Sequence, residues 1–250
     1  MLVQTAGEEW REDMTLKVLS TGSQGNCYLL QSGEETLILD CGIPIKDIKI
    51  GLNFDISKVV GVLCSHVHKD HSLSVADFEK MGIPVFKPYE DLDNILADEN
   101  FQLAQKYGDF RIVAFQLPHN GTRNCGFVIT VQGQKILYLT DFEYCRYNFR
   151  TLKINHILCE CNYMQELVDQ NLPQYEHKIK GHCSLKTCVD FIKANATDAL
   201  QTVLLLHMGA ETLDCDVAVA EVKKVVGNGV YVDYARKGLC VELKDNRCPF

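Results

Sequence analysis

One short run of metal-binding side chains constrains this chain more than any other feature of its sequence. Three histidines and an aspartate stand within six positions: His66, His68, Asp70 and His71. The run follows an apolar segment, 59–64, that is typical of a buried strand, and it precedes an amphipathic segment, 73–81, that is typical of a helix. Imidazole and carboxylate groups together suit zinc, manganese and iron. The sequence therefore predicts a strand-to-helix loop that serves two adjacent metal ions.

Three further candidate ligands stand where other apolar segments end. His119 follows the segment 111–116, Asp141 follows 135–139, and His207 follows 203–206. Each of them alone is more often a capping or hydrogen-bonded polar residue than a ligand. Because all three occupy the same kind of position, we expect them to converge on the loop that carries the first four.

The remaining pattern predicts one α/β domain. Apolar runs bounded by turn residues indicate strands at 16–20, 27–31, 36–39, 59–64, 84–87, 110–116, 126–131, 135–140, 154–160, 203–207, 229–233 and 239–243. Amphipathic spacing indicates helices at 45–52, 73–81, 185–194 and 215–226, and the polar stretch 91–109 contains helical spacing. Two successive halves of strands followed by helices predict a four-layer αββα sandwich over 15–250, with 1–14 as an N-terminal extension.

Composition narrows the partners and the compartment. The formal net charge is −8, which disfavours a long polyphosphate chain and is compatible with a small anionic substrate. No apolar run approaches the ~20 residues that span a bilayer, and the first residues do not resemble a signal peptide, so we expect a cytoplasmic protein with no membrane contact. The twelve cysteines stand mostly singly in apolar runs. They are therefore expected to be reduced core residues, and the pair Cys159 and Cys161 lacks a second pair at zinc-finger spacing.

The order His-x-His-x-Asp-His, then His, Asp and His, resembles that of the metallo-β-lactamase superfamily across nearly the whole chain. The segments 20–27 and 181–184 look like the Ser-Gly-Ser-x-Gly-Asn and Gly-His-x-Ser motifs of the WalJ/YycJ-type branch. Related phage and prophage proteins, among them the anti-Pycsar phosphodiesterases, are also similar. The resemblance implies two divalent ions, zinc or manganese, a homodimer, and a bacterial or, if phage-encoded, host cytoplasm. It implies three ligands for the first ion, three for the second and one bridge: His66, His68 and His119; Asp70, His71 and His207; Asp141.

The resemblance also suggests roles in catalysis. Asp70 would orient the attacking water besides binding metal. His182, in Gly-His-x-Ser, is the candidate for protonating the leaving group. The alternative for this segment is a helix entry, with Ser184 as the N-cap of the helix at 185–194.

Further polar residues are candidates for contact with substrate. They are Ser23, Asn26, Asn162 and Ser184. For the glycine-rich loop that carries the first two, a tight hairpin without a ligand is an equal alternative. Glu160 is a candidate for orienting ligands, the alternative being a surface ion pair. The segment 163–180 is a candidate lid or partner contact, whereas His156 and His177 are more often structural or solvated than ligands.

The sequence is compatible with three functions of different classes. The first is a phosphodiesterase that hydrolyses a nucleotide phosphodiester, preferably a cyclic mononucleotide, because the acidic net charge fits a compact anion better than a long duplex. The second is a 5′-directed DNA or RNA exonuclease, for which nucleic acid would be the partner. The third is a hydrolase of a non-phosphate ester or thioester, because one fold hosts several chemistries. A basic groove beside the metals would favour the second, and a closed pocket would favour the first.

Overall fold

The computed structural model describes residues 14–93, 103–171 and 173–244. Most of the expected N-terminal extension, residues 1–13, lies outside this range, as does 94–102 of the polar stretch. Met14, the last residue assigned to the extension, is the first residue of a strand. Within the described ranges, no helix has the length and apolar character needed to cross a membrane.

The first sheet consists of strands in the order β13-β1-β2-β3-β4-β5. These strands are β1 (Met14–Ser20), β2 (Cys27–Ser32), β3 (Glu35–Leu39), β4 (Val59–Leu63), β5 (Val85–Phe86) and β13 (Cys240–Glu242). β1, β2 and β3 form an antiparallel meander, and β4 and β5 then add in parallel. The parallel additions need crossover connections, which the first three helices supply.

The second sheet has the order β12-β11-β10-β9-β8-β7-β6. Its strands are β6 (Leu103–Tyr107), β7 (Phe110–His119), β8 (Thr122–Val131), β9 (Gln134–Leu139), β10 (His156–Glu160), β11 (Thr202–Leu206) and β12 (Tyr231–Tyr234). The strands from β6 to β9 are antiparallel, and those from β9 to β12 are parallel. Each sheet therefore repeats the same plan of a meander followed by parallel strands.

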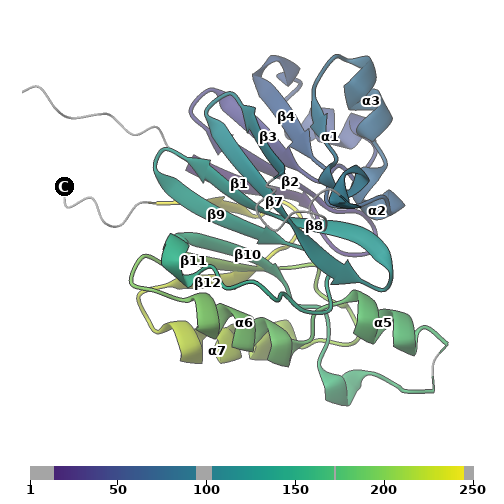
Figure 1. Cartoon of the computed structure of the whole chain (residues 1–250), viewed down its shortest axis with the longest axis vertical. Coiled ribbons are helices and arrows are strands. Elements are labelled where there is room, and N and C mark those ends of the chain that lie inside the picture. The colour runs from purple at the N-terminus through teal and green to yellow at the C-terminus, as the bar shows by residue number, and fades with distance from the viewer. Residues whose placement is uncertain (1–13, 94–102, 172, 245–250) are drawn as a thin grey trace, which may run out of the picture.

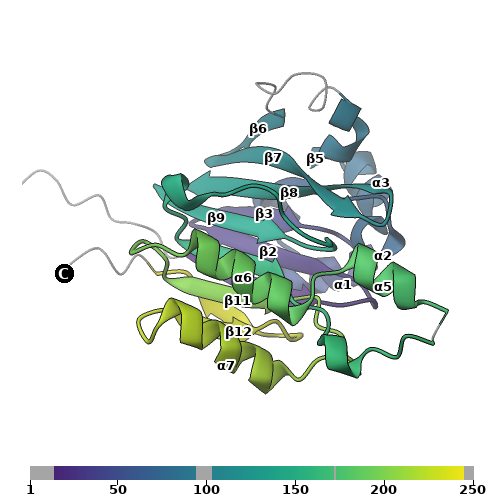
Figure 2. The same ribbon diagram turned by 60° about the horizontal axis from the view of Figure 1, so that its bottom comes forward.

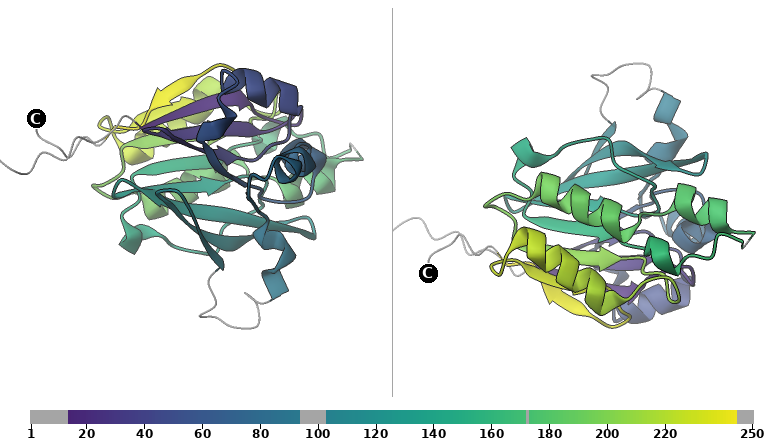
Figure 3. Two further views of the ribbon diagram at one scale, coloured as in Figure 1. Left: turned by 90° about the horizontal axis from the view of Figure 1, so that it is seen from above. Right: turned by 90° about the horizontal axis from the view of Figure 1, so that it is seen from below.

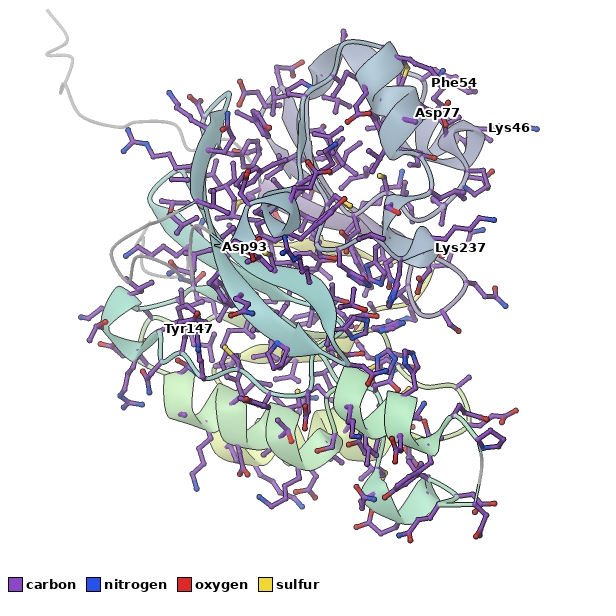
Figure 4. All side chains as sticks on the ribbon, turned by 45° about the vertical axis from the view of Figure 1, so that its right-hand side comes forward. Lys46, Phe54, Asp77, Asp93, Tyr147 and Lys237 are labelled. Atoms are coloured by element: carbon purple, nitrogen blue, oxygen red, sulfur yellow. The ribbon has the colours of Figure 1, made fainter. Side chains whose placement is uncertain are left out.

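Helices cover the outer face of each sheet (Figures 1 and 3). On the first sheet lie α1 (Ile45–Gly51), α2 (Lys69–Ser72) and α3 (Val75–Lys80); on the second lie α5 (Tyr175–Gly181), α6 (Leu185–Asn195) and α7 (Cys215–Val226). Lys46 and Phe54, near α1, point away from the sheets (Figure 4). The four-layer αββα sandwich is thereby confirmed.

The core is divided by the sheets into three apolar layers. In β3, Leu37 and Leu39 pack between the two sheets, whereas Ile38 packs toward α1 and α3. A third layer lies between the second sheet and the helices α6 and α7, and it contains the buried Cys159 and Cys161. Because both faces of these strands are buried, their sequences are continuous apolar runs, as the sequence pattern indicated.

One local prediction is wrong for part of its range, within the polar stretch 91–109. Leu103–Tyr107 is an edge strand, β6, and not helical, because it pairs antiparallel with β7 across a turn in which Gly108 has φ of 52°. Cross-strand pairing outweighs the weak local preference of such a polar segment. The helix expected at 73–81 is confirmed as α3, and a separate short helix that was not expected, α2, precedes it, so that part of the metal-binding run is itself helical.

Candidate metal centre

The predicted ligands gather at one end of the sandwich, the end marked by α2 and α5 in Figures 1 and 2. His66 and His68 follow β4, and Asp70 and His71 belong to α2. The other three stand at or just after the ends of β7, β9 and β11: His119, Asp141 and His207. The ligand atoms form two groups, and within each group all of them lie within 4.8 Å of one another. The expected convergence of strand ends is therefore present.

The first group consists of three histidines, His66, His68 and His119. His119 Nδ1 donates a hydrogen bond to the carbonyl oxygen of Gly181 at 2.6 Å. In the neutral ring, Nε2 is then the unprotonated nitrogen, and it lies 3.1 Å from His68 Nδ1. His66 Nε2 is buried and has no hydrogen-bond partner among the described residues. A buried polar atom without a partner is costly. This donor set therefore fits a metal ion that accepts three imidazole nitrogens.

The second group adds carboxylates, and it consists of Asp70, His71, Asp141 and His207. His71 Nε2 lies 3.2 Å from Asp141 Oδ1 and 3.6 Å from Asp70 Oδ2, and His207 Nδ1 lies 2.9 Å from the same Asp141 oxygen. The other Asp141 oxygen lies 4.0 Å from His66 Nε2 in the first group. Asp141 is therefore placed between the groups, where a bridging ligand would have to be.

The two groups differ in their electrostatics. Burial lowers the pKa of His66 well below its usual 6.5 and also lowers that of His119, so both rings are neutral near pH 7. Burial would lower the pKa of His207 too, but Asp141 outweighs it and raises the value to about 10. The pKa of His71 is raised well above its usual value in the same way. Burial alone would raise the pKa of Asp141, but these two histidines hold it well below 3.8.

Asp40, which sequence reasoning missed, positions the His71 ring of the second group by contacting the ring nitrogen that faces away from the other ligands. This fully buried carboxylate accepts a hydrogen bond from His71 Nδ1 at 2.7 Å and from Tyr138 Oη at 2.6 Å. It also accepts from the backbone N–H of Ser65 at 2.8 Å and from its hydroxyl at 3.0 Å. With Nδ1 protonated, the lone pair of His71 is on Nε2, the nitrogen that faces the other ligands. Such a carboxylate–histidine pair sets the orientation and basicity of a metal ligand.

Glu160 has a similar role on the opposite side. One of its oxygens lies 2.7 Å from His182 Nδ1 and 2.8 Å from His207 Nδ1, and the other accepts from the backbone N–H groups of Phe142 and Cys183. Glu160 is fully buried, so the alternative of a surface ion pair is wrong and the role of orienting other residues fits. Its oxygen also forms a third possible ligand group, with Asp141, His182 and His207.

Backbone geometry supports the three strand-end positions. Asp40, Asp141 and His207 follow β3, β9 and β11, and each has a positive φ, of 54°, 51° and 48° respectively. Residues other than glycine rarely adopt this left-handed conformation, and it persists where the surroundings enforce it. Here it turns each side chain out of its strand and into the site.

A cavity of about 720 Å³ opens above the two groups. Among the proposed substrate contacts, Ser23 and Asn162 line it, and His182 and Asp70 do so as well. Asn162 Nδ2 donates to the carbonyl oxygen of His207, and Asn162 Oδ1 is buried without a partner among the described residues. These four residues are therefore in reach of a bound molecule.

The other two proposed contacts do not line the cavity. Asn26 is fully buried, accepts from the backbone N–H of Gly22, and lies with its amide nitrogen 3.0 Å from His71 Nε2, so it holds the loop and this ligand and does not meet substrate. Ser184 caps α6 by accepting from Thr187 N–H at 3.1 Å, the helix-entry alternative. Asn26 and Ser184 were proposed as substrate contacts from motifs, and a motif does not tell which side of a loop faces the solvent.

Two cavity residues come from the segment 163–180, the candidate lid or partner contact. His177 and Lys178, both on α5, line the cavity, and the His177 ring lies 6.2 Å from that of His119 and 5.8 Å from that of His182. His177 had been expected to be structural or solvated. The expectation that 163–180 forms a lid or partner contact is consistent with this position of α5 on one wall of the cavity.

Comparison with known proteins is consistent with this geometry. A family model described as the metallo-beta-lactamase superfamily matches residues 20–108, which include the loop that carries His66, His68, Asp70 and His71. Residues 20–108 are therefore similar to this superfamily. Among curated proteins, no sequence matches this chain.

Solved structures share the metallo-beta-lactamase fold over most of the chain. The metallo-beta-lactamase fold protein YhfI from Bacillus subtilis aligns with a TM-score of 0.69 at 20% identity, covering 92% of this chain and 100% of its own. A diphosphatase from the PhnP family gives 0.63 at 14% identity, covering 92% and 98%. The short form of human tRNase Z gives 0.61 at 15% identity, covering 92% and 100%. At these identities the likeness shows the fold alone.

Proposed function

We propose that this chain is a phosphodiesterase that uses two divalent metal ions, zinc or manganese, to hydrolyse a nucleotide phosphodiester, preferably a cyclic mononucleotide. One observation carries the proposal: two groups of ligand atoms meet at Asp141 on the floor of a cavity of about 720 Å³. His66, His68 and His119 would hold one ion, and Asp70, His71 and His207 the other. When bound, such a pair supplies an activated water and offsets the negative charge of a phosphodiester.

The chain's own residues supply the remaining functions. Asp70 is part-exposed, with 28% of its side chain accessible, and it lines the cavity, so it can orient a water molecule as well as bind metal. His182 donates from Nδ1 to Glu160 at 2.7 Å. The free nitrogen of the ring, Nε2, can then hold a proton and deliver it to a leaving oxygen. Glu160 thus fixes the orientation of the ring and leaves Nε2 as the nitrogen that does not contact this carboxylate.

Size and charge support a nucleotide. A cavity of about 720 Å³ lies within the range of sites for compact ligands. Its described lining contains a single Lys or Arg, Lys178, together with acidic residues at Asp169 and Glu211. This described lining lacks the basic groove expected for a long nucleic acid, and a compact anion would depend on the metal ions and on Lys178 for positive charge. The diphosphatase and the tRNase Z are named for phosphate chemistry, which makes a phosphate ester a reasonable first substrate.

Two alternatives follow from the same site. A 5′-directed exonuclease, as in the WalJ/YycJ-type branch that the segments 20–27 and 181–184 resemble, would use the same ligands on a nucleic-acid end. An ester or thioester hydrolase would use them on a carbonyl carbon. If a second copy in the proposed homodimer closed the cavity mouth, this would favour the cyclic nucleotide over both alternatives.

The deciding experiment is a substrate panel with the protein loaded with zinc or manganese. The panel contains cyclic mononucleotides, cyclic dinucleotides, 5′-phosphorylated single- and double-stranded DNA, and a thioester. Asp141→Ala, which removes the shared ligand, is the control for contaminating activity and should lose metal and nearly all turnover. Rapid opening of cyclic mononucleotides with intact DNA supports the proposal. Progressive shortening of DNA with untouched cyclic nucleotides would replace it with the exonuclease, and thioester cleavage alone would replace it with the third function.

A further inference from the structure

The helix α5 holds a fixed position beside the metal-ligand groups. Its last turn is attached to the end of β7 by two hydrogen bonds, from the backbone N–H of Asn120 to the carbonyl oxygen of Lys180 at 2.9 Å and from His119 Nδ1 to that of Gly181 at 2.6 Å. A side chain at Gly181 would meet the His119 ring at 3.3 Å, so the helix and the ligand are in close contact. Side chains on α5 are therefore positioned relative to the site.

Lys178 is the α5 residue with the most unusual surroundings. Its side chain is half-buried on the cavity wall, and a Cβ added at Gly209 would lie 3.2 Å from its Nζ. Burial lowers the pKa of Lys178, and Glu160 only partly offsets this. No carboxylate of the described residues forms an ion pair with this ammonium group, whereas Lys180, two residues on, pairs with Glu176 at 3.1 Å.

A partly desolvated cation without a partner costs free energy. That cost is recovered when an anion binds beside it, and lysine is a common phosphate ligand because its ammonium is a compact charge with three donors. The surrounding wall contributes a second donor. His177 Nδ1 accepts from Asn120 Nδ2 at 2.9 Å, so in the neutral ring the hydrogen is on Nε2.

We propose that Lys178 is a specificity-determining residue that binds an anionic phosphate oxygen of the nucleotide substrate from the wall formed by α5. The inference rests on the proposed function, because it takes the ligand of this cavity to be a nucleotide. It adds that the substrate is recognised by a residue of the chain itself and not by the metal ions alone. With a net charge of −8, a local cation also counters the repulsion between the protein and an anion.

The test measures binding of adenosine 5′-monophosphate to the zinc-loaded full chain by calorimetry. Lys178→Met removes the charge and keeps most of the apolar side chain, and Lys178→Arg keeps the charge. Lys180→Met is the matched control on the same helix, outside the cavity. Loss of one charge-assisted hydrogen bond should weaken binding by about tenfold in Lys178→Met. Lys178→Arg should lose less affinity than Lys178→Met, and Lys180→Met should bind the nucleotide as tightly as the wild type does.

Several results would overturn the inference. They are equal affinity in Lys178→Met and wild type, equal losses in Lys178→Met and Lys178→Arg, and no binding to the wild type at millimolar concentrations. Metal content and the thermal midpoint of each variant show whether the fold and the ligand groups are intact. Because binding is measured without turnover, the two proposals can fail separately. Binding through Lys178 without hydrolysis of any phosphodiester would contradict the proposed function alone.

Discussion

Replacing Asp40 by asparagine should weaken metal binding at the second ligand group, although Asp40 itself is not a predicted ligand. Its Oδ2 accepts from His71, Tyr138 and the Ser65 hydroxyl, whereas its Oδ1 accepts from the Ser65 N–H. An asparagine would keep its carbonyl oxygen at the Oδ2 position, so its NH₂ group would face the buried Ser65 N–H. That unpaired donor costs about 1–3 kcal/mol, and exchanging a charged for a neutral acceptor at His71 costs about 1 kcal/mol more.

We therefore expect the free energy of unfolding of the metal-free Asp40→Asn variant to fall by about 2–4 kcal/mol. Metal affinity at the second group should fall by about 10–100-fold, because the neutral amide no longer raises the basicity of His71. Urea unfolding measures the first quantity, and competition with a chelating indicator measures the second.

Tyr138→Phe is the matched control for this variant. It removes one donor to Asp40 and leaves the charge, so it should cost about 1 kcal/mol of stability with little change in metal affinity. The reasoning is refuted if Asp40→Asn binds both ions as tightly as the wild type. It is equally refuted if Tyr138→Phe weakens binding as much as Asp40→Asn does.

Four other predictions concern the same end of the molecule. His182→Gln should lower turnover by about 10²–10⁴-fold on a phosphodiester with a poor leaving group and spare a nitrophenyl ester; loss of metal from the variant would instead make His182 a ligand. Metal binding at pH 7 should release protons from His71 and His207, since both have raised pKa values. Metal affinity should therefore increase with pH up to about 10, the pKa of His207. Calorimetry in buffers of different ionisation enthalpy counts the released protons, and a count of zero contradicts the ion-pair network. Without metal, the stability that the raised His207 pKa contributes is complete below pH 6.5 and is lost as the pH rises through about 10. Ser184→Ala should lower the unfolding free energy by about 1 kcal/mol through loss of the N-cap, and an altered KM would show that Ser184 does meet substrate.

Much of the ligand set could be predicted because its members share one sequence context. An apolar strand followed within three residues by His or Asp identifies His66, Asp141 and His207, and the structure brings these together. Asp40 directly follows β3 in the same context and was overlooked. Strand ends should therefore be read for all polar residues, including those that support a ligand.

Other parts of the site depend on contacts that a sequence does not display. β6 is a strand because of its partner β7 and not because of its own composition. Lys178 and Lys180 look alike in the sequence, yet one lines the cavity and the other forms a surface ion pair. Which of them is desolvated depends on how α5 is attached to β7, a tertiary contact between residues about 60 positions apart.

The ligand groups draw on both sheets, since His66, His68, Asp70 and His71 follow β4 of the first sheet and the other three follow strands of the second. A bound ion would therefore act as a cross-link between the two halves of the sandwich, comparable to a disulfide that closes a long loop. Folding and metal supply are then thermodynamically linked, so the midpoint of unfolding should rise with the concentration of free metal. A shortage of the ion would loosen the scaffold as well as stop the chemistry.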